Sequence, residues 1–288
     1  MIDRISAHLR VLVGERHPHT SRESLLAAER YIAQTFAELG YAVEPHSFDA
    51  LGGTYRNLLV SGGLAARPGE PALLVGAHYD TVIGSPGADD NASAVAVLLE
   101  CARALRQVSL QRPVRFVAFC LEEEDLLGSR AYVTALRQRG EGLAGAIILE
   151  CVGYACSEAG TQQAPPHVPV AVPSVGNFLA VVGNQASASL VSLLTAAGHR
   201  AVPDLPLVPL IVPGCGEQLP DTRRSDHAAF WDESYPAVML TDTANFRNPN
   251  YHQPTDTLET LDVEFIARVA RLVTEAVRHW AESDRHDA

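Results

Sequence analysis

The sequence is poor in cysteine, in positive charge and in long apolar runs. It has five cysteines, an odd number, and no CxxC pair, so no disulfide framework is indicated. Cys101, Cys120 and Cys151 lie in apolar stretches, where a thiol is usually a small buried hydrophobe. This cysteine usage favours a reducing compartment.

The scarcity of basic residues limits the partners. Lysine and arginine number 22 against 34 acidic residues, for a net charge of −12. Such a surface repels phosphate backbones, so no nucleic-acid partner is expected. No apolar run reaches the length of a membrane span, and the start, MIDRISAHLR, lacks the apolar segment of a signal peptide. We therefore expect no membrane partner and a cytoplasmic location, or secretion if a leader has been removed.

Apolar, strand-like stretches alternate with amphipathic helical ones. The expected strands are 41–48, 55–61, 72–77, 113–121, 143–150, 178–183 and 236–241. The expected helices are 2–13, one that starts with a Thr20–Glu23 capping box and ends at Gly40, 92–107, 129–139, 186–197, 225–231 and 262–282. This alternation predicts right-handed crossovers and a mostly parallel sheet.

Two proline-rich stretches, 152–176 and 203–221, are expected to be irregular, and long loops of this kind usually shape a site. We find no internal repeat and no linker. The sequence thus predicts an α/β fold with one three-layer domain over 1–288. Its centre would be a mixed, mostly parallel sheet flanked by helices.

Acidic and histidine side chains follow several of the apolar runs. These candidates are His78, Asp80, Asp90, Glu122, Glu123, Glu150 and, in a later loop, His252. The carboxyl ends of parallel strands meet at one edge of a sheet, where sites form. Oxygen and imidazole donors without paired cysteines indicate a zinc hydrolase whose metal is open to solvent.

Each candidate alone also has a purely structural explanation. Asp90 precedes a helix and could cap it, the run of glutamates could be a solvated turn, and His252 could be a surface loop residue. A buried pair of carboxylates, however, is unstable unless a cation neutralises it or a pKa rises. This conflict is resolved if one glutamate is a metal ligand and its neighbour is a proton shuttle.

Six stretches together resemble peptidase family M28, the zinc aminopeptidase family. They are GAHYD (76–80), PGADDNASA (86–94), LEEEDLLGSRAY (121–132), LECVGY (149–154), SDHAAF (225–230) and NPNYHQPTDTLETLD (248–262). They occur in the order found in the family and cover most of the chain from residue 70 onward.

The resemblance implies a zinc-exopeptidase (phosphorylase/hydrolase-like) fold that binds two zinc ions. One zinc would take His78, Asp90 and Glu150, and the other Asp90, Glu123 and His252. Glu122 would be the general base, Asp80 the partner of the His78 imidazole, and Tyr251 an oxyanion donor. The peptide bond after Asp90 would be cis.

Two positions depart from the family pattern. Many members have aspartate at the Glu150 position, so this ligand could bind differently. Asp125 stands where glycine is common, which puts the local backbone angles in question.

The resemblance implies a zinc-dependent exopeptidase acting on peptides, foremost an aminopeptidase that hydrolyses N-terminal residues by a metal-bound water. The alternatives are an acyltransferase similar to glutaminyl cyclase, whose relatives have tryptophan at the Tyr251 position, and a non-catalytic homologue. Asp226 could bind the substrate ammonium, or cap the helix that follows. Arg247 could bind a substrate carboxylate, or pair with a surface acid. Whether the chain forms homo-oligomers stays open.

Overall fold

The computed structural model describes residues 1–62 and 70–282, and an eight-stranded sheet forms its centre. The strands are β1 Glu44–Ala50, β2 Gly53–Gly62, β3 Ala72–His78, β4 Val114–Phe119, β5 Leu143–Glu150, β6 Leu179–Asn184, β7 Leu207–Val212 and β8 Ala237–Thr241. The helices are α1 Ile2–Leu12, α2 Arg22–Glu38, α3 Ala94–Leu105, α4 Leu127–Gln138, α5 Ala188–Ala201, α6 His227–Asp232 and α7 Val263–Glu282.

The strand order is β1-β2-β4-β3-β5-β8-β6-β7. The central strands β4, β3, β5 and β8 run parallel, β6 pairs with β8 in the antiparallel sense, and β1 and β2 form an antiparallel edge. The predicted mixed, mostly parallel sheet is therefore confirmed.

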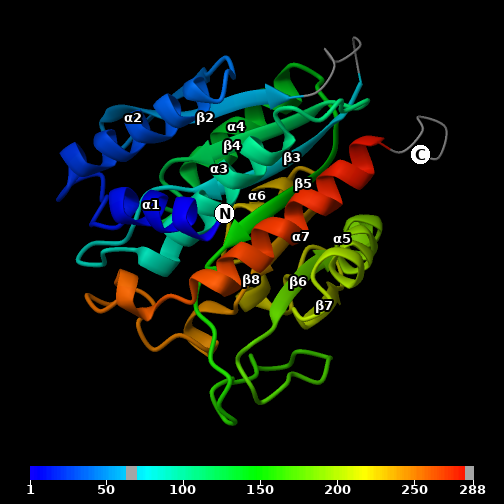
Figure 1. The fold of residues 1–288 in the computed structure, drawn as a ribbon. Helices are drawn as coiled ribbons and strands as arrows, with labels where there is room; N and C mark the ends of the chain where they lie inside the picture. The colour runs from blue at the N-terminus through cyan, green and yellow to red at the C-terminus, as the bar shows by residue number, and fades with distance from the viewer. Residues whose placement is uncertain (63–69, 283–288) are drawn as a thin grey trace.

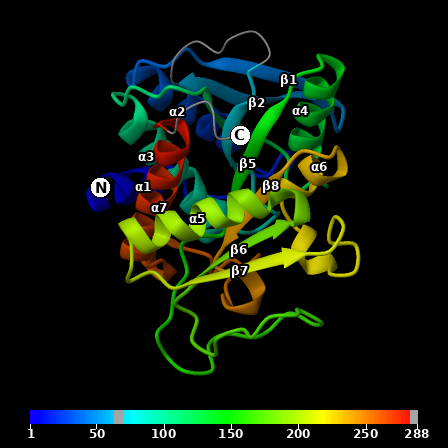
Figure 2. The same cartoon turned by 90° about the vertical axis from the view of Figure 1, so that its right-hand side faces the viewer.

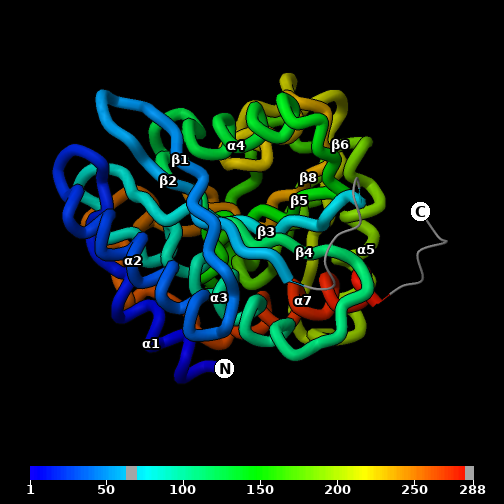
Figure 3. The backbone as a smooth tube through the Cα atoms, turned by 90° about the horizontal axis from the view of Figure 1, so that it is seen from above, coloured from blue at the N-terminus to red at the C-terminus, as the bar shows by residue number. Residues whose placement is uncertain are grey.

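Helices cover both faces of this sheet, which gives three layers. Helices α1, α3, α5 and α7 lie on one side, and α4 and α6 lie on the other (Figures 1 and 2). Strand β3 is buried along its whole length. Its Leu73, Val75 and Ala77 pack into the core under α3 and α7, whereas Leu74 packs into the core under α4 and α6. Seen from above, β3, β4 and β5 lie in the middle of the molecule (Figure 3).

Two local predictions are wrong. The stretch 203–221 contains strand β7, which pairs in parallel with β6. Pro209 opposes Val181 in this pairing, and the edge position of β7 tolerates a residue without an N–H group. The capping box is also absent, because the Thr20 hydroxyl donates to Glu15 and helix α2 begins after Ser21.

Within residues 1–62 and 70–282, no helix has both the length and the apolar character needed to cross a membrane. The single domain over 1–288 stays a prediction, since 63–69 and 283–288 lie outside the described residues.

Candidate metal centre

Three parallel strands deliver acidic or imidazole side chains to the same edge of the sheet. His78 ends β3 and Glu150 ends β5, while Glu122 and Glu123 follow β4 within a few residues. Strand β3 pairs with both β4 and β5, so these side chains meet above its carboxyl end. Asp90 lies in the irregular turn just before α3. The peptide bond that joins Asp90 to Asn91 is cis, as expected.

Asp90 occupies the middle of the group and faces both imidazoles. Its Oδ1 lies 3.2 Å from Nε2 of His78, and its Oδ2 lies 3.0 Å from Nε2 of His252. A second carboxylate accompanies each imidazole. Glu150 Oε2 is 3.4 Å from His78 Nε2, and Glu123 Oε2 is 3.4 Å from His252 Nε2. The arrangement therefore has two halves that share Asp90.

The donor set fits divalent cations. Among the described residues, buried atoms without a hydrogen-bond partner include both ring nitrogens of His78, Oδ1 of Asp90, Oε1 of Glu123 and Nε2 of His252. Buried polar atoms normally have a hydrogen-bond partner. A cluster of unpaired oxygen and nitrogen atoms is therefore suited to bind cations. Ligand atoms of His78, Asp90 and Glu123 all lie within 4.8 Å of one another, as do those of His78, Glu122 and Glu150. Imidazole nitrogens and carboxylate oxygens are ligands that zinc accepts.

The charges of the cluster lead to the same conclusion. Burial raises the pKa of Glu122 well above its usual value and that of Glu123 to about 8. Burial opposes the charged form of His252, but the adjacent carboxylates of Asp90 and Glu123 favour it and raise its pKa to about 10. Without bound cations, these side chains therefore tend to stay protonated. Bound cations would replace those protons and let the carboxylates ionise.

Asp80 contacts residues of both halves of the centre. Its Oδ1 accepts the backbone N–H of Glu122 and its Oδ2 that of Glu123, both at 3.1 Å. Nδ1 of His78 lies 3.5 Å from Asp80 Oδ1. This one carboxylate therefore fixes the turn that carries both glutamates and lies beside the His78 imidazole.

Two residues absent from the sequence-based set also hold the centre together. Asp256 accepts the backbone N–H groups of Asp89 and Asp90 at 2.9 and 3.2 Å. Buried Arg16 donates to backbone carbonyls of Leu12, Gly14, Tyr79, Pro86 and Gly87. Asp256 lies in the QPTDT stretch that carries the family resemblance, whereas no local pattern marks Arg16, because its partners are backbone carbonyls and three of them lie 63 to 71 residues away.

The two family departures have local consequences. Glu150 is anchored at its carboxylate, which accepts from the Ser225 hydroxyl at 2.8 Å. Asp125 has φ of 62° and Leu126 has φ of 60°. Asp125 thus adopts the left-handed conformation that glycine, its common family equivalent, adopts without strain.

The remaining predicted residues differ in their access to the centre. The Tyr251 ring stacks on the His252 ring with centroids 3.8 Å apart. Asp226 is fully buried and does not cap α6 through its side chain, and burial raises its pKa to about 7. Within the part of the chain that the structure describes, Arg247 pairs with no surface acid. Its Nε donates to Gln162 and its guanidinium packs 4.5 Å from the Phe178 ring centroid. The substrate contacts assigned to Asp226 and Arg247 stay predictions.

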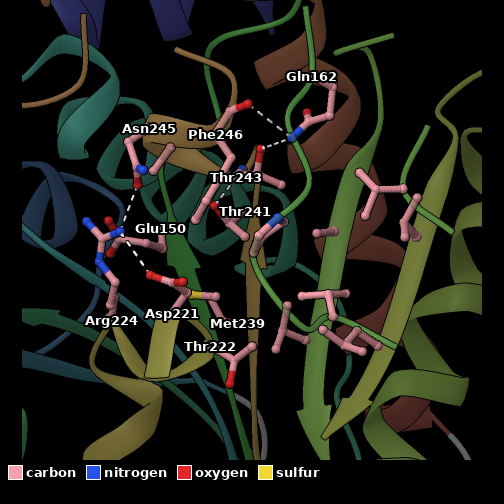
Figure 4. Close-up of a pocket in the computed structure, with 18 of the residues that line it drawn as sticks. Glu150, Gln162, Asp221, Thr222, Arg224, Met239, Thr241, Thr243, Asn245 and Phe246 are labelled. Atoms are coloured by element: carbon pink, nitrogen blue, oxygen red, sulfur yellow. Dashed lines mark hydrogen bonds and ion pairs between the residues drawn. The ribbon is translucent and has the colours of Figure 1, made fainter. Parts of the chain in front are cut away.

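A cavity opens beside Glu150 and Tyr251. Its empty volume, including the open mouth, is about 780 Å³. The deep wall is apolar and comes from β6, β7, β8 and the 152–176 loop, with Val170, Phe178 and Met239 among its side chains. The mouth carries polar groups, including Asp221, Arg224 and Asn245 (Figure 4).

The chain matches the model of peptidase family M28 over residues 60–277. It is 33% identical over 283 residues to the uncharacterized protein YfbL of Escherichia coli, covering 93% of this chain and 84% of YfbL. It is 30% identical over 223 residues to aminopeptidase YwaD of Bacillus subtilis, covering 74% of this chain. The matched region spans 42% of YwaD, so less than half of that relative is represented.

Solved structures share the fold. The LapA aminopeptidase of Legionella pneumophila superposes with a TM-score of 0.77 at 18% identity, over 98% of this chain and 72% of LapA. The zinc aminopeptidase BSAP of Bacillus subtilis gives a TM-score of 0.63 at 25% identity, over 83% of this chain and 53% of BSAP.

Proposed function

The chain belongs to peptidase family M28, and from this membership and the geometry of its acidic centre we propose that it is a zinc-dependent aminopeptidase with two metal ions. The observation that carries the proposal is the position of Asp90, with one oxygen against His78 and the other against His252. A carboxylate between two imidazoles, each with its own further acid, suits two adjacent cations.

In this proposal His78, Asp90 and Glu150 hold one zinc, and Asp90, Glu123 and His252 hold the other. Zinc ions held by these residues would lower the pKa of a water molecule and polarise the carbonyl of the scissile peptide bond. The choice of zinc is supported by the donor types and by the description of BSAP as a zinc aminopeptidase.

Glu122 is the proposed general base. Its Oε2 lies 3.8 Å from His78 Nε2, and its backbone is fixed by Asp80. Burial raises its pKa well above the usual range. An ionised carboxylate whose pKa is raised is a stronger base, so it can take a proton from the attacking water and then give it to the leaving amine. Tyr251, stacked on His252, is the proposed donor to the oxyanion.

The substrate proposal follows from the cavity. Its apolar wall, with Val170, Phe178 and Met239, suits a large apolar side chain on the N-terminal residue of a peptide. Glu150, which lines the cavity and belongs to the centre, offers a carboxylate oxygen to a substrate ammonium. We therefore propose peptides with leucine-like or phenylalanine-like N-terminal residues as substrates.

Hydrolysis of aminoacyl p-nitroanilides tests the proposal. Protein stripped of metal should be inactive and should recover activity when zinc, cobalt or manganese is restored. Peptides with a blocked N-terminus should be resistant, whereas peptides blocked at the C-terminus should be cleaved. Absence of cleavage by the reloaded protein, or release of ammonia from an N-terminal glutamine peptide without hydrolysis, would contradict it in favour of a non-catalytic homologue or a cyclising acyltransferase.

A further inference from the structure

Arg224 lies at the mouth of the cavity and connects two loops that border the metal centre. Its Nη1 donates to Oδ1 of Asn245 at 2.7 Å, and its Nη2 donates to the phenol oxygen of Tyr251 at 3.2 Å. Its guanidinium carbon lies 5.5 Å from the Tyr251 ring centroid. Figure 4 shows the guanidinium between Asn245 and Asp221, close to Glu150.

These contacts determine how Tyr251 can use its hydroxyl hydrogen. A guanidinium only donates hydrogen bonds, so the phenol oxygen must act as the acceptor toward Arg224. The single O–H hydrogen of Tyr251 is then left for another acceptor. The ring plane is fixed by stacking on His252, at an interplanar angle of 18°, and the oxygen end is fixed by Arg224. The position and direction of the phenol are thus set from both ends.

The charge of Arg224 also matters. A guanidinium that donates to the oxygen polarises the O–H bond and makes its hydrogen a better donor to a developing negative charge.

We propose that Arg224 is a positioning residue that holds the Tyr251 phenol so that its hydroxyl hydrogen points at the oxyanion of the tetrahedral intermediate. The inference depends on the proposed peptidase function and on the role of Tyr251 in it. Arg224 itself touches no reacting atom. Its contribution passes entirely through Tyr251, and this property separates it from a residue that binds substrate.

A double-mutant cycle tests this dependence. Hydrolysis of leucine p-nitroanilide, which has no carboxylate, is measured for Arg224→Met, Tyr251→Phe and the double variant, all loaded with zinc. We expect Arg224→Met to lower kcat by roughly tenfold, the size of one lost hydrogen bond, with KM within about twofold. In the Tyr251→Phe background the same change should alter kcat by less than about twofold.

Three further variants sharpen the test. Arg224→Lys keeps a charged donor and should recover part of the loss. Asn245→Ala releases the other end of the guanidinium and should lower kcat in the same direction, again only when Tyr251 is present. Arg223→Met is the matched control, because Arg223 donates to the Cys215 carbonyl and to Asp232, away from Tyr251. It should keep kcat within about twofold.

Binding of an α-aminophosphonate provides a readout that needs no turnover. Its tetrahedral phosphoryl oxygen stands in for the oxyanion, and calorimetry on the zinc-loaded protein measures its affinity. Arg224→Met should weaken this affinity about tenfold, and this effect should disappear in the Tyr251→Phe background. Zinc content should be unchanged in every variant.

The outcomes separate the two proposals. If the native protein hydrolyses the substrate but Arg224→Met acts equally in both backgrounds, Arg224 does not act through Tyr251 and this inference is overturned alone. A rise in KM without a fall in kcat overturns it in favour of direct substrate binding by Arg224. If the native protein neither hydrolyses the substrate nor binds the phosphonate, both this inference and the proposed function are wrong.

Discussion

Glu100 and Asp90 are both buried carboxylates, but Glu100 and the acids of the metal centre differ in what surrounds them. Glu100 lies on α3 with 1% of its surface exposed, and Asp90 has 2%. The carboxylate of Glu100 receives hydrogen bonds from Arg4 at 2.8 and 3.0 Å and from Arg103 at 3.1 Å. His8 lies 3.6 Å away. Burial opposes its ionisation, yet His8 and Arg4 lower its pKa to about 2.

The metal centre has more acidic side chains than the surroundings of Glu100, and fewer positively charged side chains to neutralise them. Two imidazoles face the oxygens of five carboxylates, and the nearby Arg16 donates its hydrogen bonds to backbone carbonyls instead. Burial disfavours the charged form of Asp90 too, but hydrogen bonds donated by the two imidazoles keep its pKa below the usual value. At Glu122 and Glu123 burial prevails, and it raises the pKa of Glu123 to about 8 and that of Glu122 well above normal. The direction of the pKa shift thus depends on whether the chain supplies cations, and not on burial alone. The acids whose positive partners the chain does not supply mark the place where cations from solution are needed.

The largest expected effect is the loss of the shared ligand. Asp90→Asn removes the charge between the two imidazoles, so both halves of the centre should weaken together. We expect metal content, measured by plasma mass spectrometry, to fall to less than half, and kcat/KM to fall on the order of 10³-fold or more. Asp125→Asn, at a side chain that is 80% exposed, is the control. Full metal content in Asp90→Asn would refute a bridging role.

The next effect separates chemistry from metal binding. Glu122→Gln keeps the size of the side chain but removes the proposed base. We expect kcat to fall roughly 10²- to 10⁴-fold while metal content stays unchanged. Glu124→Gln, whose side chain faces His17 instead, should retain activity. If Glu122→Gln loses as much metal as Asp90→Asn, the division of roles between them is wrong.

Removal of the metal should make the stability of the folded protein depend on pH. In the metal-free protein the pKa of Glu123 rises to about 8 and that of His252 to about 10, so the folded state binds more protons than the unfolded state. Stability should therefore decrease as pH rises from about 5 to 8, with a fall in melting temperature of roughly 5 °C or more. Calorimetry at both pH values measures this change.

Zinc should abolish this decrease, because the cations replace the protons that the cluster holds. Apart from zinc, the same buffers and the same protein serve as the control. An identical decrease with and without zinc would show that the titrating groups lie elsewhere in the molecule.

The sequence indicates where four side chains of the centre meet, because strands deliver them to one edge of the sheet. His78, Glu122, Glu123 and Glu150 each follow a continuous apolar run, and parallel pairing brings the ends of such runs together. His252 has no such run before it and was a candidate only as a member of the whole set. Its position depends on the whole loop between β8 and α7, which local patterns do not specify.

What the sequence could not predict are interactions between distant segments. Arg16 binds five carbonyls from two parts of the chain, and backbone acceptors leave no mark in a sequence. The Arg224–Tyr251 contact joins residues from different loops in the same way. Strand β7 was missed for another reason: its proline is tolerated only because the strand lies at the edge of the sheet.

The smallest effect should come from the acid that the chain neutralises by itself. Glu100→Gln keeps the shape of the side chain but removes its charge, so Arg4, half exposed to water, can turn outward at little cost. We expect the free energy of unfolding to fall by about 2 kcal/mol, with metal content and kcat unchanged. Chemical denaturation at neutral pH measures the difference. Glu275→Gln, an acid on the more exposed outer side of α7, is the matched control.

The pH dependence of this loss has the opposite sign to that of the metal-free centre. The pKa of Glu100 is depressed in the folded state to about 2. Its stabilisation is therefore present above about pH 4.5 and is lost as pH falls through that range toward 2. The native protein and Glu100→Gln should converge in stability at low pH and differ at pH 6. If the two differ equally at both pH values, Glu100 stabilises the fold through packing, and the contrast between a self-neutralised and a cation-requiring acid does not hold.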